Sequence, residues 1–180
     1  MSDHSISIVP RQSSYPENKV KATEILDWLV SQDIVKPALS DCILSSDNGY
    51  AIADGARRIT NRPDKLPFAL KSNGLEIITT RWVFDTGENG MEECICPVCK
   101  KDISSEEWSF FNDWYGQKSN SLTCPLCNIA TDIHNFQFKP EWGFSDLGFR
   151  FWNWPDLTDA FIEEFRIKLG LEISLVYQHI

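Results

Sequence analysis

Four of the six cysteines form two matching pairs whose spacing suits metal binding. The pairs are Cys96-Pro-Val-Cys99 and Cys124-Pro-Leu-Cys127, and 24 residues separate them. Each pair can place two sulfurs on one tight turn, so two turns can complete a tetrahedron of thiolates. The proline after the first cysteine fixes one backbone angle and stiffens the turn. We therefore expect Cys96, Cys99, Cys124 and Cys127 to hold one metal ion.

Zinc is the metal that this ligand set favours, because Zn²⁺ accepts four thiolates without a change of oxidation state. Iron is the less favoured alternative, since tetrahedral four-sulfur sites also suit iron. Four thiolates leave no open coordination position, so we expect a structural ion and no catalysis at it. A dithiol redox role is the least favoured interpretation, because one shared metal ion accounts for the presence and spacing of both cysteine pairs.

Residues outside the two pairs could also bear on the site. We interpret His134 as a strand side chain that makes an ordinary hydrogen bond, with a metal ligand or a base as the alternative. Cys94 precedes Cys96 by two residues, so on a strand both side chains point to the same side. We expect Cys94 to be a structural thiol, with ligand exchange or redox sensing as the alternative. Cys42 has no cysteine or histidine nearby in sequence and is expected in the core.

The cysteine pairs resemble the knuckles of zinc-ribbon proteins, and the resemblance covers residues 91–138. The commonest knuckle has glycine after its second cysteine, whereas Lys100 and Asn128 stand there in this chain. Asparagine tolerates the left-handed backbone conformation that often follows such a turn, and lysine is less suited to it. This departure bears on the fine geometry of the knuckles and not on the ligands.

A short helix is expected between the two knuckles. Ser104-Ser-Glu-Glu107 has the pattern of a capping box, and Gly116 can end the segment. Trp108, Phe111 and Tyr115 would share one helical face. We expect this aromatic face to pack the ribbon against the rest of the protein.

Two longer helices and several strands are expected around the ribbon. Apolar spacing predicts a helix over 19–32, which a capping box at 14–17 or Asn18 as N-cap could begin. A second helix follows Asp156 as N-cap and ends at Gly170. Alternation predicts that Leu171, Ile173, Leu175 and Tyr177 form the buried face of a C-terminal strand.

The remaining predicted elements complete the fold class. Residues 6–9 read as a strand, and a helical turn opens at Asp54. Asn73-Gly74 between 66–71 and 75–84 favours a β-hairpin. We predict an α+β fold, with a mixed or antiparallel sheet, flanking helices and an inserted four-cysteine ribbon. The body would comprise residues 1–90 and 139–180, and the insertion residues 91–138.

The charge balance argues against nucleic acid as the partner. Asp plus Glu number 26 against 17 Lys plus Arg, which gives a formal net charge of −9. Residues 91–155 contain nine acidic and five basic side chains, so the acidity includes the ribbon. Arg57, Arg58, Arg62 and Lys65 form a basic cluster that could meet a phosphate or an acidic partner. We favour a solvated face that pairs with nearby aspartates.

Aromatic residues are concentrated between Trp108 and Trp154, which hold 13 of the 22 in the chain. Core packing is the favoured explanation. The alternative is that the segment 148–155 exposes its rings at a protein interface, where Trp and Arg are common anchors.

A membrane location is not expected, because the longest apolar run is the four residues Tyr50–Ala53 and a spanning helix needs about 20. Residues 1–10 lack the basic start and apolar stretch of an export signal, so we expect a cytoplasmic protein.

Several short motifs together resemble a family of uncharacterised bacterial zinc-ribbon proteins. Besides both cysteine pairs, they are Ile8-Val-Pro-Arg11, Asp27-Trp-Leu-Val30, Gly49-Tyr-Ala-Ile52, Gly55-Ala-Arg57, Asn73-Gly-Leu-Glu76 and Phe144-Ser-Asp-Leu-Gly148. Members are sometimes labelled sugar ABC transporter ATPases. A P-loop needs Gly-Lys before Ser or Thr, and none of the nine glycines here precedes lysine. The resemblance implies a bacterial cytoplasmic setting but no particular activity.

The sequence supports three hypotheses of function. The leading one is a non-enzymatic interaction protein in which zinc fixes the ribbon and an acidic, aromatic-rich surface binds another protein, as in an immunity or regulatory protein. The second is an enzyme, such as a hydrolase, with a small-molecule site in the body that uses carboxylates such as Asp41 or Asp54. The third is a nucleic-acid-binding ribbon, which the acidity disfavours.

Overall fold

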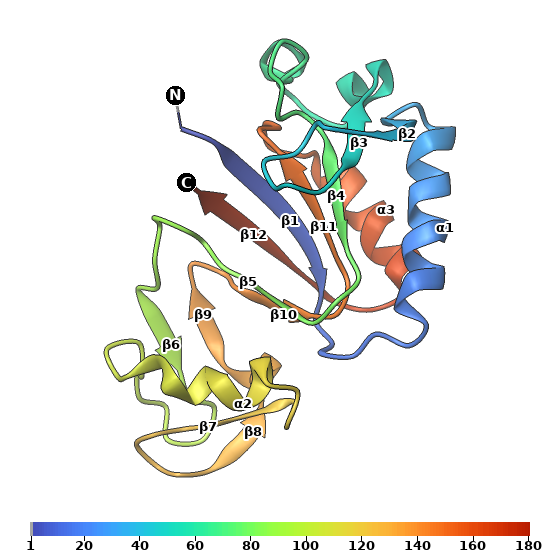
Figure 1. Ribbon diagram of the computed structural model, residues 1–180. Helices are drawn as coiled ribbons and strands as arrows, with labels where there is room; N and C mark the ends of the chain where they lie inside the picture. Colours follow the sequence, from blue (N-terminus) through green and yellow to red (C-terminus); the bar gives the residue numbers. More distant parts are fainter. Residues whose placement is uncertain (1) are drawn as a thin grey trace.

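A six-stranded antiparallel sheet forms the body of the protein in the computed structural model, which describes residues 2–180. The strand order is β12-β1-β11-β4-β3-β2. The strands are β1 (His4–Pro10), β2 (Val35–Ser40), β3 (Gly49–Ile52), β4 (Leu75–Ile78), β11 (Gly148–Trp152) and β12 (Ile173–His179). Helices α1 (Asn18–Ser31) and α3 (Asp159–Leu169) cover one face (Figure 1). The predicted α+β class with an antiparallel sheet and flanking helices is therefore confirmed.

The main core lies between the sheet and these two helices. Alternate residues of β1 and β11 point toward the helices, which follows from the two-residue period of a strand. The buried side chains of the two layers include Ile6, Ile8, Phe149 and Phe151 on the sheet, and Ile25, Leu29, Phe161 and Phe165 on the helices. Short 3-10 helices η1 (Asp54–Arg58) and η2 (Pro63–Lys65) lie between β3 and β4 in the chain. The predicted turn at Asp54 is η1.

The opposite face of the sheet contains a nearly buried ion pair. Arg150 on β11 lies opposite Glu76 on β4, and its Nη1 is 3.4 Å from Glu76 Oε2. Trp152 Nε1 donates to the same oxygen at 2.9 Å. The Arg150 guanidinium also lies 5.5 Å from the centroid of the Phe84 ring. These contacts compensate for the loss of hydration of both charged groups.

Residues 82–145 form three small antiparallel sheets. They are β5 (Trp82–Phe84) with β10 (Gly143–Ser145), β6 (Glu93–Ile95) with β9 (Gln137–Lys139), and β7 (Ser121–Thr123) with β8 (Ala130–Asp132). Three short helices, η3 (Trp108–Phe111), α2 (Asn112–Tyr115) and η4 (Ile133–Asn135), complete this region. Strands β6 to β9 gather beside α2, apart from the large sheet (Figure 1). This arrangement places both cysteine pairs in the smaller part of the structure.

The predicted aromatic contact between ribbon and body exists, and two of the three predicted residues take part in it. Phe111 stacks on Phe144 at 5.7 Å between ring centroids, and Trp108 packs edge-on against Trp142 at 5.6 Å. Tyr115 is exposed, whereas Trp114, which was not predicted, is fully buried. The Trp114 ring packs edge-on against Phe144 of β10, and its Nε1 donates to Ser13 Oγ at 2.8 Å. The prediction was wrong for Tyr115, because residues 108–115 form a 3-10 turn followed by one α-helical turn, so continuous α-helical spacing does not apply.

The hairpin predicted at Asn73-Gly74 was wrong. Both backbone N–H groups donate to Cys42 O at 2.9 Å, and β4 pairs with β11 and β3 instead of with residues 66–71. A Cβ on Gly74 would lie 2.3 Å from Cys42 Sγ, so glycine permits this close approach.

Two predicted helix caps were also wrong. Helix α1 begins after Glu17 without a side-chain cap, and Asn18 uses its amide to donate to Thr79 O and Asp146 O. Helix α3 is capped by Thr158, whose Oγ1 accepts from the Phe161 N–H, so Asp156 lies too early in the chain. Gly170 ends α3 in the left-handed conformation, as predicted.

The burial pattern of β12 differs from the prediction. Ser174 and Val176 are buried, and Tyr177 is exposed. Val176 packs with Val9 and Phe84 on the face away from the helices, whereas Ile173 and Leu175 are only partly buried against the main core.

Core packing accounts for the aromatics at 148–155. Phe149, Phe151, Trp152 and Trp154 are all buried, which overturns the alternative that this segment exposes its rings at an interface.

No helix within residues 2–180 has the length and apolar character needed to cross a bilayer.

Candidate metal centre

The two cysteine pairs lie on turns with the same backbone pattern. Each turn follows a short strand, β6 for Cys96 and β7 for Cys124. The first cysteine donates its N–H to the carbonyl five residues later, Lys101 O at 3.0 Å and Ile129 O at 3.1 Å. Its own carbonyl accepts from the N–H four residues later, which belongs to Lys100 or Asn128. Both turns are therefore knuckles of one geometry.

The residues after each second cysteine adopt the left-handed conformation. The φ angle is 62° at Lys100 and 61° at Asn128. Lys100 thus adopts a backbone conformation that is usually taken by glycine, and this has an energetic cost. The cost is smaller at Asn128, because asparagine adopts the left-handed conformation more readily than lysine. Both positions therefore adopt the conformation that glycine usually supplies in such a turn.

The four sulfurs come together between the knuckles. The Sγ atoms of Cys96, Cys99, Cys124 and Cys127 all lie within 4.8 Å of one another. Cys96 Sγ lies 3.9 Å from Cys127 Sγ, and Cys99 Sγ lies 3.8 Å from Cys124 Sγ. For sulfurs about 2.3 Å from a central ion, tetrahedral edges are close to this length. The cluster could therefore hold a metal ion.

The electrostatics of the cluster also favour a cation. Burial opposes ionisation of Cys96, but the N–H groups of Cys99 and Val98 lower its pKa to about 7. The Ile129 N–H favours ionisation of Cys127, yet burial and the other three sulfurs raise its pKa to about 11. The four thiols therefore do not all ionise near neutral pH by themselves. A divalent cation supplies the positive charge that four adjacent thiolates need.

Cys94 and His134 do not belong to the four-cysteine cluster. Cys94 is buried on β6, and burial raises the pKa of its thiol to about 12, with the Asp102 charge adding to the effect. His134 places Nε2 2.8 Å from Phe144 O and Nδ1 2.9 Å from Asp132 Oδ1. Both ring nitrogens thus contact oxygen acceptors, as the predicted hydrogen-bonding role requires. The predicted strand position was wrong, because His134 lies in the 3-10 helix η4. Cys42 is buried beside Ile43 and Trp152, as predicted.

The carboxylates named for an enzyme do not lie together with the cysteines. Asp41 pairs with Lys71 at 2.8 Å on the surface. Asp54 lies 3.9 Å from Arg57 and borders a cavity of about 230 Å³ beside Phe68. Neither residue joins the cysteine cluster.

Three exposed apolar side chains lie in or next to the two cysteine turns and were not singled out in the sequence. Val98 and Leu126 occupy the same position in the two Cys-Pro-x-Cys turns, and Ile129 follows the second turn. Each is more than two-fifths exposed, at 44%, 43% and 46% respectively. The sequence could have predicted the exposure of Val98 and Leu126, because a residue between the two cysteines of a tight turn points away from the ion.

Comparison with protein-family models found no match to this chain. The curated proteins and the solved structures likewise gave no match. The geometry and chemistry of its own residues therefore carry the functional argument.

Proposed function

We propose that the chain is a non-enzymatic protein-interaction module whose ribbon is held by one structural zinc ion. Cys96, Cys99, Cys124 and Cys127 would be its four ligands. Zinc suits a closed shell of four thiolates, and the paired knuckles leave no ligand position for a reacting molecule. The setting would be a bacterial cytoplasm, in line with the family resemblance and with reduced cysteines.

The observation that carries the interaction role is the apolar surface of the knuckles. Val98, Leu126 and Ile129 expose aliphatic side chains on the turns that the metal would hold rigid. Rigid apolar side chains lose little entropy on binding, so a fixed knuckle surface favours association. The metal would then act indirectly by ordering the contact surface.

Charge supports a basic partner. The net charge of −9 would steer association with a positively charged protein, as in an immunity or regulatory complex. The apolar knuckles would supply contact area, and the net negative charge would set the salt dependence.

A native pull-down with matched variants tests this proposal. Tagged protein should recover a stoichiometric partner from lysate of the source cells, and the V98D/L126D double variant should lose it while keeping its metal. The control is V20D, because Val20 is also exposed, at 55%, but lies on α1. Equal recovery with all three proteins, or recovery of no partner under several salt conditions, would contradict the interaction role.

Absorption spectra separate zinc from iron. A zinc protein is colourless, whereas a four-thiolate ferric site absorbs visible light. A coloured protein with one iron per chain would overturn the choice of zinc and leave the ligand set intact.

A further inference from the structure

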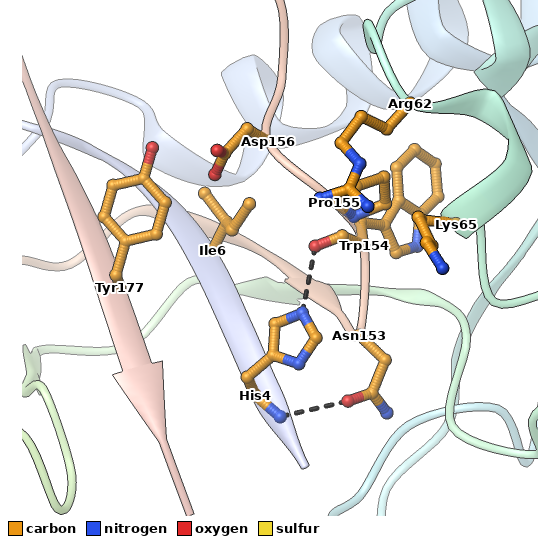
Figure 2. Close-up of a pocket in the computed structure, with 9 residues that line it drawn as sticks. All are labelled: His4, Ile6, Arg62, Lys65, Asn153, Trp154, Pro155, Asp156 and Tyr177. Atoms are coloured by element: carbon orange, nitrogen blue, oxygen red, sulfur yellow. Dashed lines mark hydrogen bonds between the residues drawn. The ribbon is translucent and has the colours of Figure 1, made fainter.

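A second site on the body is independent of the metal centre. A cavity of about 380 Å³ lies where η2 and residues 153–156 meet the ends of β1 and β12. Figure 2 shows Tyr177 and Asp156 on one side of it and Arg62 and Lys65 on the other, with the His4 ring between them. This volume falls within the range of small-molecule sites, about 300 to 1,000 Å³.

The floor of the cavity is rigid. Ile6 and Trp154 are buried there, and Trp154 Nε1 donates to Asn73 O at 2.7 Å. Asn153 is buried in the left-handed conformation, with φ 64°. Its amide contacts three groups, donating to Asp3 Oδ1 and Ser72 O and accepting from the His4 N–H. A floor fixed by hydrogen bonds needs little reorganisation to bind a ligand.

The charged groups around the cavity are not used by the fold. Within residues 2–180, no carboxylate lies in ion-pair distance of Arg62 or Lys65, and no cation pairs with Asp156. The other two members of the same basic cluster do have partners. Arg57 pairs with Asp54 and lies over the Phe68 ring, and Arg58 donates to Gln32 O. The cluster therefore has two structural arginines and two cations that are free for a ligand.

His4 and Tyr177 add further hydrogen-bonding groups. His4 Nε2 lies 3.1 Å from Trp154 O, and a carbonyl only accepts, so Nε2 carries the hydrogen. In the neutral ring, Nδ1 is then an acceptor. Burial raises the pKa of Tyr177, with the Asp156 and Asp159 charges adding to it, so the phenol stays a protonated donor at neutral pH.

We propose that this cavity binds a small zwitterionic molecule. Arg62 and Lys65 would hold its anionic group, a carboxylate or a phosphate, and Asp156 would hold a protonated amine at the other end. The apolar floor and Tyr177 would contact the carbon skeleton between the two charges. A ligand with charges of both signs fits because the cavity keeps unpaired charges of both signs on opposite sides.

Ligand titrations followed by NMR of the full chain test the proposal. The probes are the free amino acids and O-phosphoethanolamine, which combine an amine with a carboxylate or a phosphate. Each is compared with its N-acetylated form, and the amino acids also with their amides. At least one zwitterion should bind with Kd below about 1 mM and shift the Tyr177 amide and Trp154 indole signals. Whether carboxylate or phosphate probes bind identifies the anionic group.

Variants test which residues bind the anionic group and the amine of the ligand. R62Q/K65Q should weaken binding at least about tenfold, and D156N should remove the preference for a free amine over an acetylated one. R57Q is the matched control and should bind as the unaltered chain does. The proposal is overturned if no probe gives saturable shifts up to about 10 mM, if R62Q/K65Q binds normally, or if acetylated probes bind equally well.

Discussion

Trp114 should be the main anchor between the ribbon and the body, and its replacement gives a graded prediction. The side chain is fully buried against Phe144, and its Nε1 donates to Ser13 Oγ. Arg81 lies 4.1 Å above the ring and donates to Trp114 O. Truncation of a buried Trp to Ala costs about 3 to 5 kcal/mol, so W114A should lower the free energy of unfolding by about 4 kcal/mol.

A milder variant isolates the hydrogen bond. W114F keeps an aromatic ring in the cavity but leaves the buried Ser13 hydroxyl without its partner, so it should cost about 2 kcal/mol. For a chain of this size, a loss of 1 kcal/mol in the free energy of unfolding lowers the melting temperature by about 2 to 4 °C. The W114A variant should therefore melt roughly 8 to 16 °C lower than the unaltered chain. Because S13A removes the same bond, W114F and S13A should be non-additive by about 1 kcal/mol.

Denaturant unfolding at saturating metal measures the free energy of unfolding of W114A, W114F, S13A and the W114F/S13A double mutant. Metal content is the internal control, because Trp114 is not a cysteine-cluster residue and W114A should keep its ion. A loss below about 1 kcal/mol for W114A would refute the buried-anchor argument. Additive effects of W114F and S13A would refute the hydrogen bond.

Three further predictions concern other parts of the structure. E76Q should destabilise the fold by about 3 kcal/mol in chemical denaturation, because it leaves the nearly buried Arg150 charge uncompensated, and an unchanged midpoint would contradict this. G74A should cost about 1 to 3 kcal/mol in the same assay, because its Cβ would lie 2.3 Å from Cys42 Sγ, and unfolding at the same denaturant concentration as the unaltered chain would contradict this. The pKa of Asp102 should fall below its ordinary 3.8, because the Cys94 and Ser104 N–H groups stabilise the carboxylate. The ionised Asp102 carboxylate then contributes its full stabilisation above pH 3.8, and this contribution is lost as the pH falls through the lower pKa of the folded state. An NMR titration that gives a pKa of 3.8 or more for Asp102 would contradict the prediction.

Local patterns in the sequence predicted the elements whose causes are local. The period of α1 and the glycine at the end of α3 both correspond to the structure, because helical amphipathicity and left-handed termination depend on a few neighbouring residues. The cysteine spacing likewise predicted the clustering of four sulfurs.

The errors arose where distant residues decide the outcome. Asn73-Gly74 has the composition of a hairpin turn, but its N–H groups bind Cys42 O, more than 30 residues earlier. Asn18 could cap α1, but its amide is used by carbonyls of Thr79 and Asp146. Val176 is buried by Phe84 and Val9, which no alternation within β12 reveals.

The functional surfaces divide in the same way. The metal cluster follows from two local motifs, whereas the body cavity joins side chains from four separate segments. The basic cluster at 57–65 was visible in the sequence, but its division into two paired and two unpaired cations depends on the tertiary structure.

Metal analysis of the purified chain tests the central claim most directly. Elemental analysis should give about one zinc per chain, and C96S and C124S should each lose the metal and melt at lower temperature. The ligating thiols should react with a thiol reagent only after a chelator removes the ion. Protein that is fully folded without metal, or C96S and C124S variants that keep both full metal content and unchanged melting, would contradict the account.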